Sequence, residues 1–149
     1  MSSRIAKNTV LLLGASVAQK ILSFAYFTLI ARAAHIGVDG TGAYVTALSF
    51  STMFSILADV GMNPVLVREV AKAREHASRF LSTVLAVKVF AALLSYALLI
   101  ATVQFSGYAP LVRELVRYTG IVMILDAVHL SFYGVLRGFE ELRYESLGV

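Results

Sequence analysis

Five ionisable side chains lie deep inside long apolar stretches, where their chemistry depends on what they face: Lys20, Asp59, Lys88, Asp126 and His129. A charged side chain in the middle of a bilayer costs about 2.5 to 3.5 kcal/mol on insertion scales, so it usually faces a partner or a water-filled cavity. A lysine in such a cavity attracts anionic groups, and a carboxylate there can bind a cation or a proton. The sequence therefore indicates a membrane protein with a polar interior.

The stretches that carry these residues are each long enough to cross a bilayer, because about 20 helical residues span the hydrocarbon core. We expect transmembrane helices at residues 9–34, 43–62, 80–103 and 118–136. With 58% hydrophobic residues, 15% charged residues and a mean hydropathy of +0.78, the chain is far from the composition of a soluble domain. The predicted fold is an all-α, polytopic integral membrane protein.

The distribution of Lys and Arg predicts the orientation, since short cytoplasmic loops carry the excess of positive charge. One predicted side of the membrane holds eight of the thirteen cations, at Arg4, Lys7, Arg68, Lys72, Arg74, Arg79, Arg137 and Arg143. Both termini should then be cytoplasmic. Between the second and third helices, residues 65–79 alternate apolar and charged positions at helical spacing, which predicts an amphipathic segment along the cytoplasmic membrane surface.

The helical rise places several charges at similar depths. One hypothesis pairs Asp126 with Lys88, with His129 one turn away as a hydrogen-bonded neighbour or proton relay, and leaves Lys20 free to attract an anionic substrate. In the alternative, Asp126 pairs with Lys88 or Lys20 only to hold the helices together. Arg32, at the outer end of the first helix, is either an interfacial anchor or a contact for emerging substrate.

Asp59 lies near the cytoplasmic end of the second predicted helix, within expected reach of Arg68 in the next segment. We expect this pair to form a structural clamp or gate. No nucleophile elbow, zinc-protease motif or P-loop is present, and the three histidines are too scattered to chelate a metal by local spacing. We therefore expect no enzyme activity, cofactor or metal. The cations do not form a nucleic-acid recognition surface, so no nucleic-acid partner is expected.

Several short segments, in order, resemble the N-terminal part of polysaccharide flippases. They are Ala31-Arg32, Gly40-Thr41-Gly42-Ala43-Tyr44, Asp59-Val60-Gly61-Met62, Val67-Arg68-Glu69-Val70-Ala71 and Leu136-Arg137-Gly138-Phe139-Glu140. These flippases belong to the superfamily of multidrug, oligosaccharidyl-lipid and polysaccharide exporters. The resemblance implies transport of a polyprenyl-pyrophosphate-linked saccharide across the cytoplasmic (inner) membrane, by two lobes of a fold with 12–14 helices.

On that resemblance the chain looks like the N-terminal part of a flippase lobe. Its expected partners are membrane lipids, the saccharide lipid, and missing C-terminal helices or other copies of the chain. Two alternatives remain open at this point. A multidrug or cation antiporter of the same superfamily would use Asp126 as its coupling carboxylate. A small four-helix membrane scaffold would not transport at all.

Overall fold

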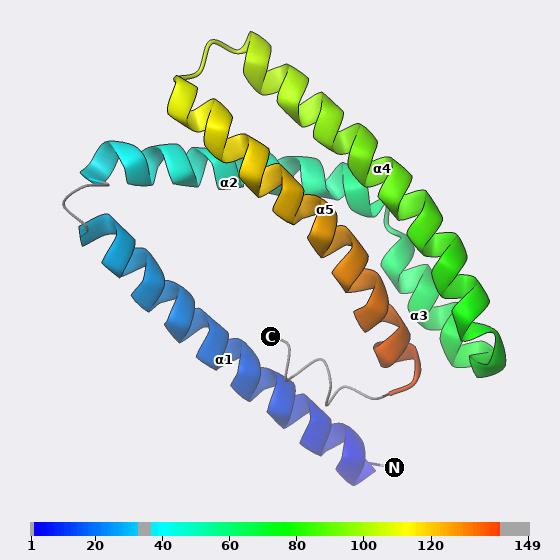
Figure 1. Cartoon of the computed structure of the whole chain (residues 1–149). Coiled ribbons are helices and arrows are strands. Elements are labelled where there is room, and N and C mark those ends of the chain that lie inside the picture. Colours follow the sequence, from blue (N-terminus) through cyan, green and yellow to red (C-terminus); the bar gives the residue numbers. More distant parts are fainter. Residues whose placement is uncertain (1, 33–36, 141–149) are drawn as a thin grey trace.

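The computed structural model describes residues 2–32 and 37–140, and the regular structure in this part of the chain is entirely helical. The elements follow in the order α1 (Ser2–Arg32), α2 (Gly37–Asp59), α3 (Met62–Lys72), the short 3₁₀ helix η1 (Arg74–His76), α4 (Ala77–Phe105) and α5 (Pro110–Gly138). Figure 1 shows α4 and α5 as a long hairpin that α2 crosses, with α3 beside the end of this hairpin. The all-α class predicted from the sequence is confirmed.

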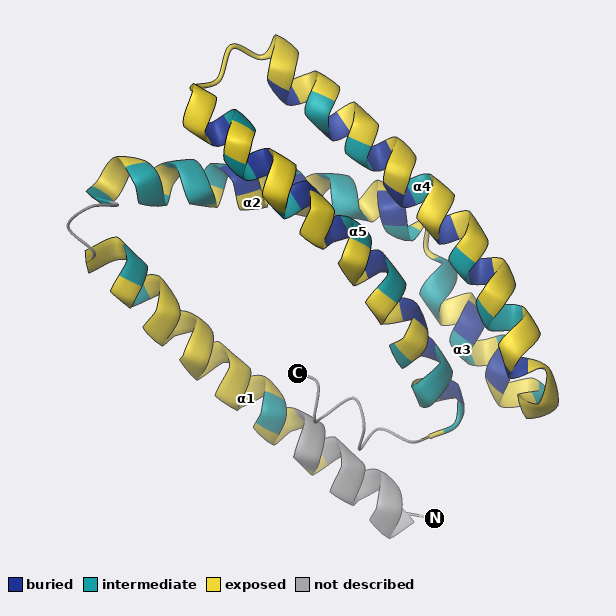
Figure 2. Cartoon of the chain, viewed as in Figure 1, coloured by how far each residue is buried: buried dark blue, intermediate teal, exposed yellow. Residues whose placement is uncertain are grey.

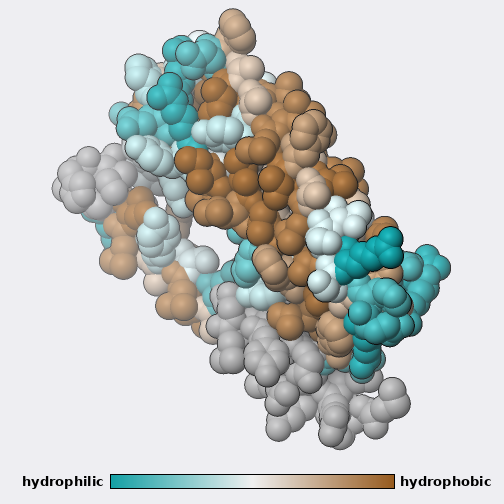
Figure 3. Space-filling model, turned by 45° about the vertical axis from the view of Figure 1, so that its right-hand side comes forward, coloured by the Kyte–Doolittle hydropathy of each residue, from teal (hydrophilic) through white to brown (hydrophobic). Residues whose placement is uncertain are grey.

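Four helical segments are long and apolar enough to cross a membrane: Leu13–Arg32, Gly37–Asp59, Arg74–Phe105 and Pro110–Gly138. On the face seen in Figure 3, hydrophobic residues form a broad surface that separates two hydrophilic ends. The four long helices begin before the spans that hydropathy predicted. For example, α5 begins at Pro110 instead of residue 118, because a proline at the first helical position needs no hydrogen-bond partner for its nitrogen.

The protein core consists of α2, α4 and α5, which contact one another extensively. Buried residues form one stripe along α4 and one along α5, spaced mainly three and four residues apart, as Figure 2 shows. Toward the end where α4 connects to α5, Ala47 of α2 packs with Leu99 and Val103 of α4 and with Val112 and Val116 of α5. This packing fixes which side of each helix faces the interior.

By contrast, α1 lies apart from the hairpin, as Figure 1 shows, and no residue of its candidate membrane span is buried (Figure 2). Its most extensive contacts are with α2. Tyr26 of α1 lies beside Tyr44 of α2. The side of α1 that faces away from α2 is therefore an apolar surface that contacts no other described helix extensively.

The chain breaks between α2 and α3 at Val60 and Gly61, which adopt left-handed backbone conformations with φ of 52° and 66°. A glycine takes this conformation without strain, whereas valine rarely does. The second span was expected to end at residue 62. Instead, α2 ends at Asp59, and Pro64 lies in the first turn of α3, where its missing N–H costs no helical hydrogen bond.

The amphipathic character predicted for residues 65–79 is present, and the apolar face of α3 packs against other helices. Leu66 and Val70 of α3 are buried against α4 and α5. Two glycines of α5 leave room for these side chains. A Cβ at Gly138 would lie 2.7 Å from a Val70 methyl carbon, and one at Gly134 would lie 3.2 Å from a Leu66 methyl carbon. The apolar face thus packs on protein because small residues let α3 approach closely.

Candidate functional site

Lys88, in the middle of the α4 stripe, is completely buried and forms an ion pair with Asp59 at the end of α2. Its ammonium also donates a hydrogen bond of 2.9 Å to the side-chain oxygen of Asn63, in α3. The amide of Asn63 in turn donates to the Asp59 carboxylate at 3.1 Å. The three side chains close a ring of polar contacts that joins α2, α3 and α4 at the helix break.

The geometry of the break explains this cluster. Because the chain turns at Val60 and Gly61, Asn63 lies one turn beyond Asp59 and both side chains meet Lys88. A buried charge is tolerable when it is paired and hydrogen-bonded, and here both conditions hold. The arrangement is suited to holding helices together, since the Lys88 ammonium is closed off from solvent.

Two predicted charge pairs are therefore wrong. Lys88 was expected to pair with Asp126, but its ion pair is with Asp59, whereas Asp126 lines the groove between α2 and α5. Asp59 was expected to form a clamp with Arg68, but its ion pair in the described part of the chain is with Lys88. Arg68 lies on the exposed side of α3, away from the break.

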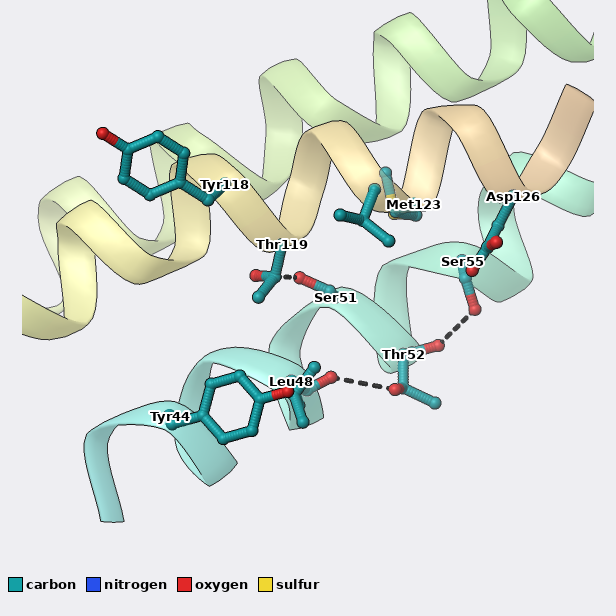
Figure 4. Close-up of a pocket in the computed structure, with 10 residues that line it drawn as sticks. Tyr44, Leu48, Ser51, Thr52, Ser55, Tyr118, Thr119, Met123 and Asp126 are labelled. Carbon is teal, nitrogen blue, oxygen red and sulfur yellow. Dashed lines mark hydrogen bonds between the residues drawn. The ribbon is translucent and has the colours of Figure 1, made fainter. Parts of the chain in front are cut away.

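A second polar region is a groove between α2 and α5, with a volume of about 300 Å³ (Figure 4). Hydroxyl groups dominate its polar lining, and Asp126 adds a carboxylate. The residues that line it are Tyr44, Leu48, Ser51, Thr52, Ser55, Tyr118, Thr119, Val122, Met123 and Asp126. All of them lie within segments apolar enough to span a membrane, so the groove places polar groups at membrane depth.

Hydrogen bonds within the groove show which hydroxyls hold the fold and which only line the space. The Ser51 hydroxyl donates to the Thr119 hydroxyl at 2.6 Å, which links α2 to α5. Thr52 and Ser55 donate to backbone carbonyl oxygens of their own helix, at Leu48 and Thr52 (Figure 4). Their hydroxyl oxygens can still accept hydrogen bonds from a bound molecule.

Asp126 is exposed and lies at the same end of the groove as Ser55 (Figure 4). No ion pair or hydrogen bond joins its carboxylate to any residue that the structure describes. His129 is also exposed, and its ring packs against that of Tyr133, with centroids 4.2 Å apart. The structure therefore places His129 in an aromatic contact and leaves Asp126 available in the groove.

The two cations predicted to contact substrate, Lys20 and Arg32, are both exposed on α1. Tyr26 of α1 contacts Tyr44, which lines the groove. Lys20 lies six residues before Tyr26, about 9 Å toward the N-terminal end of α1. Arg32 ends α1. Among the described residues, no three His, Cys, Asp or Glu side chains gather closely enough to hold a metal ion.

Asn63, Ser51 and Thr119 were not singled out from the sequence. Asn63 had one detectable signal, since it stands four residues after Asp59 and two residues after the glycine that breaks the helix. Ser51 and Thr119 had none, because isolated hydroxyl residues are common in apolar helices and their pairing depends on how α2 crosses α5.

The sequence matches the polysaccharide biosynthesis protein family over residues 5–148. The chain belongs to this family. The match confirms the resemblance found in the short sequence segments, and it covers α2 to α5 completely and α1 from residue 5 onward. No curated protein and no solved structure is significantly similar to the chain. As a member of the polysaccharide biosynthesis family with four apolar spanning helices, the protein is a multi-pass membrane protein.

Proposed function

We propose that this protein forms the N-terminal part of a transporter that moves a polyprenyl-pyrophosphate-linked saccharide across the cytoplasmic membrane, with its N-terminus in the cytoplasm. The observation that carries the proposal is the groove between α2 and α5, where hydroxyls, two tyrosines and a carboxylate gather at membrane depth. Hydroxyl and carboxylate groups hydrogen-bond to sugar hydroxyls, and aromatic rings pack on the apolar faces of sugars.

The charges divide between the roles such a transporter needs. Lys88 is neutralised by Asp59, which supports a structural role for that pair. Lys20 remains exposed on α1, where its ammonium can act as a point charge for the pyrophosphate of the lipid carrier. Arg32 provides a second cation at the outer end of the same helix, for substrate that leaves toward the outside.

A non-transporting scaffold is a weaker proposal. A scaffold needs the Lys88–Asp59 pair, but it has no use for a polar groove that exposes the Asp126 carboxylate, which has no ion pair with any described residue. The antiporter alternative uses the same groove and makes Asp126 the coupling site. The two transport functions differ in their substrate, so an assay of saccharide-lipid translocation distinguishes them.

The test is translocation by the native gene product in proteoliposomes, with a fluorescent polyprenyl-pyrophosphate saccharide whose headgroup an impermeant glycosidase can cleave. We expect protein-dependent exposure of the headgroup, loss of it in Lys20→Ala and retention in Lys20→Arg. Lys72→Ala, which removes an exposed cation of α3, is the matched control. Exposure of the headgroup no faster than in protein-free liposomes would contradict the proposal. Full activity of Lys20→Ala would show that Lys20 does not bind the substrate.

A further inference from the structure

A second groove lies between α3 and α4, at the opposite end of the bundle from the α4–α5 connection, with a volume of about 520 Å³. Its walls are mostly apolar, and charged residues stand at its rim. The residues that line it are Val65, Leu66, Glu69, His76, Arg79, Phe80, Thr83 and Val84. The groove is separate from the one between α2 and α5, and no step of the proposed transport uses it.

The depth of this groove follows from the length of α4. Its 29 residues extend about 44 Å, whereas the hydrocarbon core is about 30 Å thick, so each end protrudes by roughly 7 Å when the helix is centred. Arg79, in the first turn of α4, then lies among the lipid headgroups. Phe80 and Val84 follow toward the hydrocarbon. The groove therefore joins a charged rim at headgroup depth to an apolar trough at acyl-chain depth.

The charge at the rim is positive. The ionisable residues that line the groove are Glu69, His76 and Arg79. Glu69 is neutralised within the protein, because Lys72 donates a 2.8 Å hydrogen bond that lowers the pKa of the Glu69 carboxyl. Glu75 contacts His76, and Arg74 lies over the ring of Phe139.

Arg79 differs from these residues, since its guanidinium has no ion pair or hydrogen bond with any described part of the chain. The helix macrodipole does not explain its position either, because a cation in the first turn of a helix is unfavourable. An anion bound beside Arg79 would relieve this repulsion and complete the hydrogen bonds of the guanidinium, which suits phosphate groups.

We propose that the groove between α3 and α4 binds an anionic phospholipid, with the phosphate on Arg79 and His76 and an acyl chain along Val65, Phe80 and Val84. The charge of the rim selects an anionic headgroup, and the apolar trough at acyl-chain depth selects a lipid over a free phosphate. Basic clusters at the membrane interface attract anionic lipids in this way. The bound lipid would support the junction of α3 with α4. This binding does not depend on the transport proposed above.

The chain contains no tryptophan, so a single one reports on its own surroundings. Val65→Trp places a reporter in the groove at a residue that is 55% exposed, and Phe105→Trp places a matched reporter at the other end of α4, where the side chain is 90% exposed. The protein is reconstituted in mixtures of phosphatidylcholine and phosphatidylglycerol, one of which carries brominated acyl chains, and quenching gives the relative affinity for the two lipids.

We expect a preference of about fivefold for phosphatidylglycerol at Val65→Trp and none at Phe105→Trp. Adding Arg79→Ala should abolish the preference, whereas adding Arg68→Ala, which removes an equal charge outside the groove, should leave it. If Arg79→Ala and Arg68→Ala reduce the lipid preference equally, the preference comes from the general surface potential of the protein, and the proposal is overturned. Equal quenching by the two lipids at Val65→Trp, and at Phe80→Trp as a second reporter, would also overturn it. The thermal midpoint of each variant establishes that it is folded.

Discussion

Lys88 and Asp59 form an ion pair in which the two partners differ in burial: the Lys88 side chain is fully buried, whereas that of Asp59 is 35% exposed. The pair closes the junction where α2 ends and α3 begins, and Asn63 bonds to both partners. At the helix break, the bundle is thus held together by a lysine ammonium that is closed off from water and a carboxylate that is partly accessible to water.

This asymmetry predicts that the two single neutralisations differ. Asp59→Asn leaves a buried cation without a counter-ion, so we expect a loss of about 3 to 5 kcal/mol in stability. Lys88→Met should cost less, because the remaining carboxylate is partly exposed and still accepts a hydrogen bond from Asn63. Thermal unfolding in detergent shows which of the two variants loses more stability.

The double variant Asp59→Asn/Lys88→Met should recover most of the stability lost in Asp59→Asn, since no isolated charge remains. Lys72→Met is the control, because its pair with Glu69 lies at the exposed surface, where ion pairs contribute little to stability. If Asp59→Asn and Lys72→Met shift the thermal midpoint equally, the buried pair does not hold the junction.

The contact of α3 with α5 depends on the absence of a side chain at Gly138. In Gly138→Ala, the new Cβ would lie 2.7 Å from one carbon of Val70 and 3.1 Å from the backbone oxygen of Val67, so α3 must shift. We expect a loss of about 1 to 3 kcal/mol, as for other overpacked sites. Protease resistance of the α3–α4 connection and the thermal midpoint both report it.

Gly42→Ala serves as the comparison, because a Cβ there meets no atom within 4 Å and alanine favours a helix by about 0.5 to 1 kcal/mol. Combining Gly138→Ala with Val70→Ala should restore part of the stability by removing the clash. An equal effect of the two glycine substitutions would show that close packing of α3 on α5 is not required.

Across the groove, the hydrogen bond between Ser51 and Thr119 couples α2 to α5. Interhelical hydrogen bonds in membrane proteins contribute about 0.6 kcal/mol on average. We therefore expect a double-mutant cycle with Ser51→Ala and Thr119→Val to give a coupling energy of this size in thermal unfolding. Additive effects of the two substitutions would mean that the hydroxyls do not interact in the membrane.

Asp126 should affect transport but not stability. Its carboxylate has no partner in the described structure, and a charge at membrane depth is itself costly. Asp126→Leu should thus leave the thermal midpoint unchanged or raise it, while reducing translocation of the saccharide lipid at least tenfold. A lower midpoint together with normal translocation would assign Asp126 to the fold instead.

The membrane class, the helices and the family could be predicted because hydropathy and short ordered motifs are local in the sequence. The charge pairs could not be predicted in the same way. Depth follows from position along a helix, whereas pairing depends on the direction of each side chain around it. The stripe that contains Val84, Lys88 and Ala92 marks Lys88 as interior, but only the break at Val60 and Gly61 brings Asp59 to it.

The same limit applies to the groove. Its hydroxyls come from two helices that are separated by more than fifty residues, and their meeting depends on how α2 crosses the hairpin of α4 and α5. For residues 65–79, periodicity identified the apolar face correctly. It could not tell whether lipid or protein would cover that face, because both environments favour the same residues.

Reaction of one introduced thiol tests most directly whether the groove between α2 and α5 receives the saccharide lipid. The 149 residues contain no cysteine, so Ser55→Cys adds a single thiol inside the groove, and Phe90→Cys, 72% exposed on the apolar surface of α4, adds the control. In membranes, we predict that a charged, water-soluble thiol reagent labels Ser55→Cys and that polyprenyl-pyrophosphate saccharide slows this labelling severalfold. Labelling no faster than at Phe90→Cys, or labelling unaffected by the saccharide lipid, would contradict the account.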